Sequence, residues 1–479
     1  MEKPIIRLEK LSISNLKNVS HGEVVFSNPR RPDGASVLGL YGQNGSGKST
    51  MVDALEMAQQ CMLGVRLDER FAQLVSVDAD YGQVECELSV RWHTIGTVYR
   101  ILYSFKVRSD AYEPEEVEDE SNIEPKEGPR PCVFDERLAI ASDTEGNKVR
   151  MTTLVDTAGI RVFKPSVKYA HLIGAGLQEA LGLAVEKKLA YRESRSFVFS
   201  RALIRTIVAR EKESFTLHQD AKDAAFAISA LGTFARQNMF VLNARDSGML
   251  ALDTLPLPFR IANGERTLAG GIGLPMDGAK TIPERIYGAV TNVIENMNTV
   301  LRELIPGLEV HTEVLGTEFT RDGEKGISIQ LVSKREGRTI PLSCESEGIK
   351  RIVSFLHLLI LMFNDPSVTV VVDEIDSGVF EYLLGELLSI VSEHGQGQLI
   401  FTCHNLRPLE TIDRGYVAFT TTNPNERYVR MTNVKSSNNL RDFYYRDIVL
   451  GGQKERLYEP TNNGEIELAF IEAGVAIEG

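Results

Sequence analysis

The N-terminal part of the chain alternates between polar and apolar residues in four short segments. Leu8 to Ile13 and Gly22 to Phe26 alternate on either side of a polar turn at Asn15 to Ser20. Gln83 to Trp92 and Val98 to Val107 alternate in the same way. Because successive side chains of a strand point to opposite faces, this period predicts paired strands with one buried face. We expect an antiparallel sheet in this region.

Three other segments are predominantly apolar without alternation, which predicts strands that are buried on both faces. They are Ser36 to Leu40, Val368 to Val372 and Gln398 to Cys403. A helical pattern from Val379 to His394 separates the last two. Buried strands connected through helices favour a parallel sheet, so the pattern predicts an α/β fold with a mixed central sheet.

Helical periodicity begins at about Ala170 and continues to Leu242, which predicts an inserted helical lobe. Gly270 to Gly278 is rich in glycine and is predicted to be a linker. Ile282 to Leu304 predicts one amphipathic helix. The two segments that follow, Leu308 to Phe319 and Gly326 to Ser333, predict a hairpin.

These patterns divide the chain into three predicted parts. Residues 1–165 form an N-terminal lobe with the antiparallel strands, residues 166–306 the helical lobe and linker, and residues 307–479 a C-terminal lobe. Within the first part, residues 110–131 are dense in Asp, Glu and Pro and have few apolar side chains. Such a segment cannot bury enough surface to offset the entropy of ordering it, which predicts a solvated loop. An acidic docking segment is the alternative.

The composition indicates a globular protein, since 43% of its 479 residues are hydrophobic. The formal net charge of −13 argues against binding of nucleic acid through the overall field, although a local basic surface is compatible with it. Seven basic residues of the helical lobe are candidates for a surface that binds nucleic acid or an acidic partner: Lys187, Lys188, Arg192, Arg195, Arg201, Arg205 and Arg210. The alternative is a helical face whose cations pair with Glu186, Glu193 and Glu211.

The cysteines and the apolar segments bear on the compartment. Five cysteines lie far apart without a Cys-x-x-Cys pair, which favours a reduced environment over zinc or a disulfide framework. The N-terminus lacks the apolar core of a signal peptide. The longest apolar segment, Ile352 to Phe363, is too short to span a bilayer and predicts a buried helix. We expect a cytoplasmic protein without membrane contact.

A phosphate-binding loop follows the first fully apolar strand and precedes a helical pattern. Its residues are Gly42, Gln43, Asn44, Gly45, Ser46, Gly47, Lys48, Ser49 and Thr50. The glycines allow backbone N–H groups to face a phosphate, and the helix adds the positive end of its dipole. We expect Lys48 to reach the β- and γ-phosphates of ATP and Ser49 to hold Mg²⁺. The alternative, an ordinary glycine-rich turn, explains neither Lys48 nor Ser49.

The two remaining apolar strands end in residues suited to the same chemistry. Asp373 and Glu374 end the first, where Asp373 is predicted to support Mg²⁺ and Glu374 to polarise the attacking water. His404 ends the second and is placed to contact the γ-phosphate, because ligands bind outside the carboxyl ends of parallel strands. The alternatives are a buried strand that ends in exposed acids and a structural histidine.

A third motif precedes the apolar helix at Ile352 to Phe363. Ser346 is placed to cap this helix, and the amides of Glu347 and Gly348 would form an anion site. These residues could also be an N-cap without further function.

Together these motifs resemble the ABC-type ATPase heads of the RecF, SMC and OLD-like proteins. The residues that carry the resemblance are the phosphate loop, Ser346-Glu347-Gly348, Asp373-Glu374, Asp376-Ser377-Gly378 and His404. The opening segment from Leu11 to Asn18 is also similar to the first strand and turn of these heads. The resemblance implies an ABC-type head with an accompanying antiparallel subdomain and a helical lobe, and ATP hydrolysis that involves Lys48, Glu374 and His404.

In this family the signature serine and glycine of one subunit close over the ATP bound by another. The resemblance therefore implies that Ser346 and Gly348 act in trans and that the protein forms a dimer or larger homo-oligomer. The segment Ser346-Glu347-Gly348 departs from the fuller Leu-Ser-Gly-Gly-Gln signature of transporters. The glutamine that links nucleotide to the helical lobe is left open between Gln237 and Gln83.

Within the family, the chain lacks the long coiled-coil arms of SMC proteins and the added domains of transporters. The segment after His404 is too short for a C-terminal TOPRIM nuclease. With these subfamilies disfavoured, the chain most resembles the stand-alone OLD-like ATPases of anti-phage systems, such as the PARIS type. This implies an ATPase that responds to a nucleic-acid or phage-protein trigger and controls a separate nuclease-like effector. The alternatives are a RecF-like DNA repair ATPase and an ATP-bound scaffold with little turnover.

Overall fold

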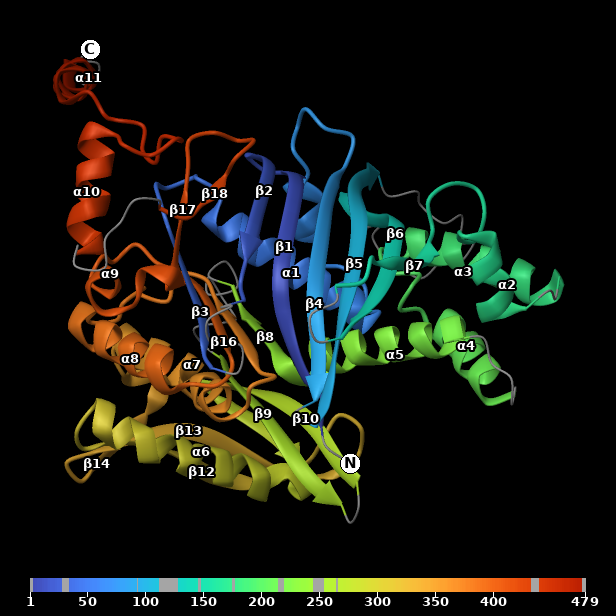
Figure 1. Ribbon diagram of the computed structural model, residues 1–479. Helices are drawn as coiled ribbons and strands as arrows, with labels where there is room; N and C mark the ends of the chain where they lie inside the picture. Colours follow the sequence, from blue (N-terminus) through green and yellow to red (C-terminus); the bar gives the residue numbers. More distant parts are fainter. Residues whose placement is uncertain are drawn as a thin grey trace.

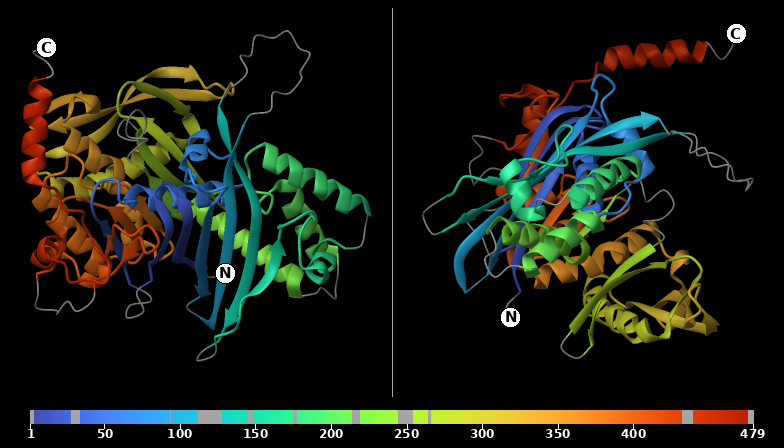
Figure 2. Two further views of the ribbon diagram at one scale, coloured as in Figure 1. Left: turned by 90° about the horizontal axis from the view of Figure 1, so that it is seen from above. Right: turned by 90° about the vertical axis from the view of Figure 1, so that its right-hand side faces the viewer.

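The computed structural model describes residues 3–27, 34–92, 94–111, 128–144, 148–174, 177–213, 219–243, 254–263, 266–431 and 439–475. Most of the predicted acidic loop 110–131 lies outside these residues. Figures 1 and 2 show three connected regions: two large sheets that share a core, a group of helices at one end, and a smaller α/β unit below the central sheet.

The central sheet has six strands in the order β18-β17-β3-β16-β15-β8. Their bounds are β18 (Tyr428–Val429), β17 (Val417–Thr420), β3 (Ser36–Tyr41), β16 (Gln398–Thr402), β15 (Thr369–Val372) and β8 (Met239–Leu242). All neighbours pair in parallel except β17 and β18, so the predicted mixed central sheet is confirmed. The helical lobe was expected to reach Leu242, but the last four residues instead form β8 because they pair with β15.

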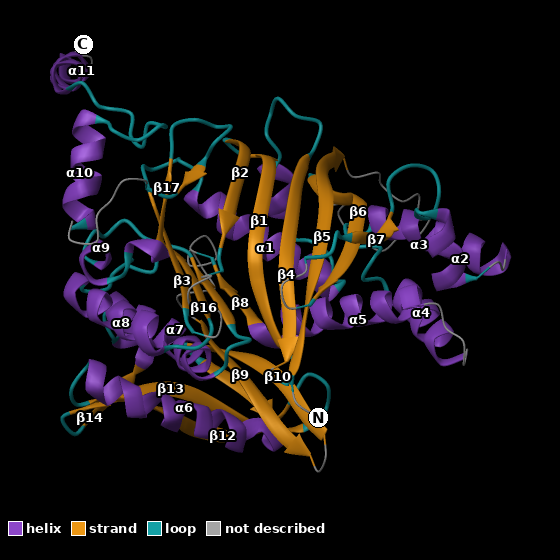
Figure 3. Ribbon diagram, in the orientation of Figure 1, coloured by secondary structure: helices purple, strands orange, loops and turns teal. Residues whose placement is uncertain are grey.

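The central strands are buried on both faces, which explains why their sequences do not alternate. In β15, Val371 packs into the core shared with the antiparallel sheet, whereas Val370 and Val372 pack into the core on the opposite side. These three positions must therefore all be apolar. Helix α7 (Glu347–Asn364) packs against β15 and β16, and α8 (Glu381–His394) packs against α7 (Figure 3).

The second large sheet is antiparallel, as predicted, in the order β2-β1-β4-β5-β6-β7. Its strands are β1 (Ile5–Leu16), β2 (Val19–Val25), β4 (Gly82–Trp92), β5 (Ile95–Ala111), β6 (Pro129–Asp143) and β7 (Thr152–Asp156). Helix α1 (Lys48–Leu63) shares one core with this sheet and with the central sheet.

One glutamine connects inner strands of the two large sheets. The Gln398 side chain, at the start of β16, donates to the carbonyl of Leu8 in β1 (2.8 Å) and accepts from the N–H of Leu8 (2.7 Å). Its oxygen also accepts from the Thr369 hydroxyl of β15 (3.0 Å). A single buried amide on β16 thus satisfies polar groups of β1 and β15, one strand from each sheet.

The smaller unit contains a two-stranded and a four-stranded sheet around α6 (Glu284–Leu304). Its strands are β9 (Thr254–Asn263), β10 (Arg266–Pro275), β11 (Ala279–Pro283), β12 (Leu308–Phe319), β13 (Lys325–Arg335) and β14 (Arg338–Pro341). The hairpin of β12 and β13 confirms a prediction. The prediction of a glycine-rich linker at Gly270 to Gly278 is wrong, because β10 pairs with β9 along its length. A Cβ atom at Gly273 would lie 2.6 Å from the Thr254 side chain, so glycine here lets the strands approach.

Helices form the two ends of the molecule. At one end lie α2 (Ser166–Ile173), α3 (Leu177–Arg192), α4 (Arg201–Glu213) and α5 (Gln219–Thr233), as the helical periodicity predicts. At the other end lie α9 (Pro408–Thr411), α10 (Leu440–Leu450) and α11 (Asn463–Val475). Among the described helices, none has both the length and the apolar sequence needed to cross a membrane. The domain boundaries proposed above stay a prediction.

Candidate nucleotide-binding site

A pocket of about 520 Å³ lies where the phosphate loop meets the carboxyl ends of the central strands. It is lined by Lys17, Asn18, Asn44, Gly45, Ser46, Gly47, Lys48, Ser49, Thr50, Glu374 and His404. The loop therefore meets residues that follow it by more than 300 positions in the sequence. This is the arrangement expected for a triphosphate site, in which a lysine and a carboxylate face one pocket.

The loop has the backbone conformation that its glycines permit. Gly45 and Gly47 have φ angles of 74° and 95°, in the left-handed region that other residues rarely adopt. Helix α1 begins at Lys48, directly after Gly47, and has no acidic residue in its first turn. Its N–H groups and dipole therefore favour an anion in the pocket.

Two strands at the edge of the central sheet support the loop from behind. The Thr420 hydroxyl of β17 donates to the Ser46 hydroxyl (2.5 Å), and the Tyr428 hydroxyl of β18 donates to the Gly47 carbonyl (2.8 Å). A Cβ atom at Gly42 would lie 1.7 Å from the Thr420 hydroxyl oxygen. The loop shape thus depends on residues that sequence analysis did not identify.

Lys48 lies in the field of the predicted acidic residues. Its ammonium donates to the carbonyls of Gly42 (2.8 Å) and Gln43 (3.1 Å). Burial lowers the pKa of Lys48 from its usual value, whereas the charges of Asp373 and Glu374 oppose this shift. Lys48 and Glu374 line the same pocket, as the triphosphate interpretation requires.

Asp373 lies just behind the pocket rather than on its surface. Its side chain is buried, and one carboxylate oxygen accepts from the Thr402 hydroxyl (2.5 Å). The other oxygen is buried without a hydrogen-bond partner among the described residues. A cation or its bound water would satisfy this oxygen. Together with the Ser49 hydroxyl in the pocket, Asp373 fits a Mg²⁺ ion.

The described residues contain no group of three or more His, Cys, Asp and Glu side chains that could hold a metal alone. Mg²⁺ commonly keeps several water ligands and binds through one or two protein oxygens and the substrate phosphates. The donor set of Ser49 and Asp373 therefore suits a metal that arrives with the nucleotide, rather than a resident metal.

Glu374 lines the pocket in an unusual backbone conformation. Its φ angle is 49°, and non-glycine residues in this region carry strain that is often linked to function. Its N–H donates to the Thr402 hydroxyl (2.7 Å), and its carbonyl accepts from the Arg351 guanidinium (3.1 Å). These contacts hold the residue at the pocket that the phosphate loop also lines.

Arg351 was missed by sequence analysis although it connects two of the predicted motifs. It belongs to α7, the helix that Ser346 caps, and its side chain is 2% exposed. Besides Glu374, it donates to the carbonyl of Asp373 (2.6 Å). A movement of α7 would therefore be transmitted to both acidic residues. A lone arginine in an apolar helix gives no sign of this contact in the sequence.

His404 lines the pocket and is exposed. Its backbone N–H and that of Asn405 donate to one carboxylate oxygen of Asp376, at 3.0 and 2.7 Å. Asp376 thus fixes the segment that presents the histidine. The loop Asp376 to Gly378 and His404 are coupled within one chain.

The structure does not bring Ser346 and Gly348 into the pocket of their own chain. Ser346 is exposed and caps α7, since its hydroxyl accepts from the N–H of Ile349 (3.4 Å). A Cβ atom at Gly348 would lie 2.3 Å from the carbonyl oxygen of Gly378. The signature segment therefore packs against the loop Asp376 to Gly378. Its action on a second copy stays a prediction.

Lys17 and Asn18, at the turn between β1 and β2, also line the pocket and were not predicted as site residues. The Asn18 amide donates to the Gly45 carbonyl, and the Lys17 ammonium pairs with the buried Asp53 of α1. The only sequence signal was that this segment is similar to the opening of ABC-type heads.

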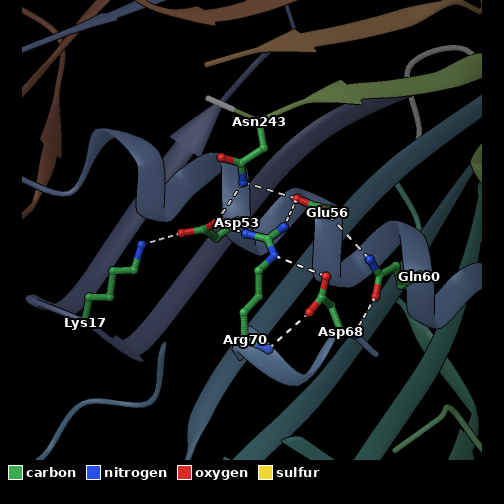
Figure 4. Close-up of polar contacts among 7 residues, drawn as sticks. All are labelled: Lys17, Asp53, Glu56, Gln60, Asp68, Arg70 and Asn243. Carbon is green, nitrogen blue, oxygen red and sulfur yellow. Dashed lines mark hydrogen bonds and ion pairs between the residues drawn. The ribbon is translucent and has the colours of Figure 1, made fainter. Parts of the chain in front are cut away.

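Asp53 is the centre of a polar network beneath α1 (Figure 4). One of its oxygens accepts from Arg70 (3.1 Å) and from the Asn243 amide (2.9 Å). Arg70 also pairs with Glu56, which accepts from Asn243 (3.2 Å). The network ties α1 to the β1–β2 turn, to η1 (Glu69–Leu74) and to the end of β8.

The two glutamines considered for linking nucleotide to the helical lobe are not among the residues that line the pocket. Gln237 lies in η2 (Phe234–Asn238) and Gln83 in β4. Asn243 directly follows β8, the strand that pairs with β15. Its amide contacts α1 instead of the pocket.

No protein-family model and no curated protein matches the chain. The solved structures with which the chain aligns include the following SMC head domains. The SMC head domain from Thermotoga maritima is 17% identical, with 89% of this chain and 99% of that chain covered and a TM-score of 0.35. The Smc head domain from Pyrococcus furiosus bound to the C-terminal domain of ScpA is 12% identical, with 89% and 97% covered and a TM-score of 0.38. The Smc head domain from Pyrococcus yayanosii is 11% identical, with 92% and 100% covered and a TM-score of 0.38. Identities and TM-scores this low do not indicate an activity or a partner.

Proposed function

We propose that the protein is an ABC-type ATPase that binds ATP with Mg²⁺ and hydrolyses it. The observation that supports this proposal is the pocket in which the phosphate loop meets Glu374 and His404. Lys48 and the loop amides bind the phosphates, and Ser49 with Asp373 supports the metal. Glu374 orients the attacking water, and His404 contacts the γ-phosphate.

The proposal includes a homo-oligomer with shared sites. Ser346 and Gly348 lie at an exposed edge rather than in the pocket of their own chain. An exposed helix N-terminus offers N–H groups to an anion, so these residues would complete the site of a second copy. Hydrolysis would then depend on protein concentration, whereas ATP binding to the phosphate loop would not.

The finer role that we propose is a regulator in bacterial anti-phage defence, with a separate nuclease-like effector. The similarity of the motifs to those of stand-alone OLD-like ATPases supports this part of the proposal. Nucleotide-dependent contacts between copies would hold or release the effector. A nucleic acid or phage protein would act as the trigger.

Two substitutions test the ATPase proposal. Lys48→Ala should abolish binding of a fluorescent ATP analogue, because the phosphates lose their cation. Glu374→Gln should keep binding and lower hydrolysis by roughly 10² to 10⁴-fold, because the amide cannot accept a proton. Lys334→Ala, on the exposed end of β13, is the matched control. Tight ATP binding by Lys48→Ala would contradict the assignment of the loop.

The regulatory role needs a separate test. Purification of the tagged protein from its native host should recover a second chain, and Glu374→Gln should abolish protection against phage without abolishing that recovery. Protection by Glu374→Gln at the wild-type level would instead support an ATP-bound scaffold. Salt-dependent binding to duplex DNA, without a second chain, would favour a RecF-like repair ATPase.

A further inference from the structure

A second pocket lies at the end of the molecule that carries α3, and it shares no lining residue with the nucleotide pocket. It has a volume of about 450 Å³, within the range of pockets that bind small molecules. Its walls come from β6, from the segment 157–162 that follows β7, and from α3 (Figure 1). Six of the side chains that line it are apolar: Val133, Phe134, Ile160, Val162, Ala184 and Phe197.

Two aromatic side chains of the wall are held by cations of β5. The Arg108 guanidinium lies 5.3 Å from the ring centroid of Phe134 and 5.2 Å from that of Tyr191. The Tyr191 hydroxyl accepts from Arg108 (2.6 Å) and donates to Asp110. The Lys106 ammonium lies 6.0 Å from the Phe134 ring centroid. These contacts restrain the rings, so we expect the pocket to be preformed.

The one acidic side chain that lines the pocket, Glu136, is fully engaged within the chain. It is 2% exposed. One carboxylate oxygen accepts from the hydroxyls of Tyr103 (2.7 Å) and Ser196, and the other from the N–H groups of Phe197 (2.7 Å) and Val198 (3.3 Å). These four donors occupy the acceptor sites of the carboxylate, so it has none left for a ligand.

The Lys187 ammonium is engaged as completely. It donates to the carbonyls of Thr157 (2.6 Å), Gly159 (3.0 Å) and Arg161 (2.7 Å), which uses its three donors and holds the segment 157–162 against α3. A polar ligand group in the interior would therefore lose its hydrogen bonds to water without replacement from these side chains. The interior of the pocket favours an apolar group, and a nucleobase is disfavoured for the same reason.

Two residues that line the pocket are exposed to solvent and suit the outer part of a ligand. Ile160 is fully exposed, so an apolar ligand in the pocket would bury hydrophobic surface of this side chain. Of the cations that line the pocket, Arg192 has an interaction within the chain, whereas exposed Lys188 has no ion pair among the described residues. Lys188 is therefore available for an anionic group.

The remaining residues of the predicted basic surface do not line this pocket. Arg195 pairs with Glu186 (3.1 Å) and Glu193 (2.5 Å), as the salt-pair alternative expected. The three arginines of α4 also lie outside the pocket. Their binding to nucleic acid or to an acidic partner stays a prediction.

We propose that this pocket binds a small amphipathic monocarboxylate, with its alkyl or aromatic body inside the pocket and its carboxylate beside Lys188. The engaged side chains of Glu136 and Lys187 exclude a polar body, and Lys188 selects the charge of the polar end. The site does not depend on the proposed ATPase activity, so it can be tested on the full chain without nucleotide.

The experiment measures binding of the fluorescent dye anilinonaphthalene sulfonate, an aromatic anion, and its displacement by three ligands with the same alkyl chain. Wild-type protein should bind the dye at a saturable site. Decanoate should displace the dye more readily than decanol, and decylammonium least, because only the carboxylate pairs with Lys188. Circular dichroism of each variant checks that it is folded.

Substitutions locate the site. Ala184→Trp should abolish the dye signal that decanoate displaces, because the indole fills the pocket. Ile160→Asp should weaken the binding of all apolar ligands and, being on an exposed segment, should leave the fold intact. Lys188→Glu should weaken decanoate several-fold and decanol less, as expected for an exposed ion pair. Phe470→Asp, on exposed α11, controls for dye bound to other apolar surface and should behave as the wild type.

Dye binding that decanoate does not displace would overturn the proposal, as would displacement that neither Ala184→Trp nor Ile160→Asp affects. Displacement by decylammonium as readily as by decanoate would refute a carboxylate at Lys188. Loss of the displaceable signal in Phe470→Asp would place the ligand at α11 instead of this pocket.

Discussion

The phosphate-loop pocket and the signature segment Ser346-Glu347-Gly348, here called the signature edge, differ in how many remote parts of the chain support them. The pocket is supported by hydrogen bonds from Thr420, Tyr428 and Asn18, which are remote in sequence. The signature edge is held by local contacts: the cap of Ser346, the ion pair of Glu347 with Lys350 (2.6 Å) and the close contact of Gly348 with Gly378. Under the proposed function, we expect one copy to be preorganised to bind nucleotide and the signature edge to act only when a second copy covers it.

Two substitutions compare the stability that each region contributes. Asp53→Asn should lower the free energy of unfolding by about 3 to 5 kcal/mol, because it leaves the cations of the network under α1 without their buried carboxylate. Ser346→Ala should cost only about 1 kcal/mol, the value of a helix cap. Urea unfolding followed by the fluorescence of Trp92 measures both. Equal losses would show that the signature edge is supported as firmly as the pocket.

Gly348→Ala should separate binding from hydrolysis. The new methyl group would collide with the carbonyl of Gly378 and displace the signature edge. We expect ATP hydrolysis to fall by roughly 10²-fold, as misplacement of catalytic surfaces commonly causes, with binding of an ATP analogue unchanged. Gly182→Ala, on α3 with open space around its Cβ position, is the control. A parallel loss of binding would mean that the two regions are not separable.

The smallest expected effect concerns pH. Burial lowers the pKa of Lys48, and only its protonated form attracts phosphate. As pH rises towards that lowered pKa, ATP affinity should fall several-fold, at a lower pH than an ordinary lysine would give. Titration of ATP binding between about pH 7 and pH 10 measures this, because lysine ordinarily titrates near the upper limit. Lys48→Arg, whose charge persists, should remove the dependence, and an unchanged slope would refute it.

Much of the fold was predictable because its signals are local. The buried strands β3, β15 and β16 are apolar at most positions since both faces meet a core, and the phosphate loop follows the first of them. Strand β10 was not predictable, because its glycines read as a linker and only the pairing with β9 shows that they fit a strand.

The candidate site shows the same limit. Lys48, Glu374 and His404 were placed by their positions after strands, and the structure brings them into one pocket, although their roles stay predictions. Arg351 and Asp53 could not be found in this way, because each matters through buried contacts with remote segments. A charged residue in a helix carries no sequence signal that distinguishes burial against a partner from exposure.

Gln398 has a consequence for how the molecule can move. Its amide joins β16 to β1 at one end of the two large sheets, and Arg427 donates to the Asn18 carbonyl at the other. Because the sheets are connected at both ends, we expect them to move as one rigid body. We expect any conformational change to occur instead at the attachments of α7 or of the unit around α6.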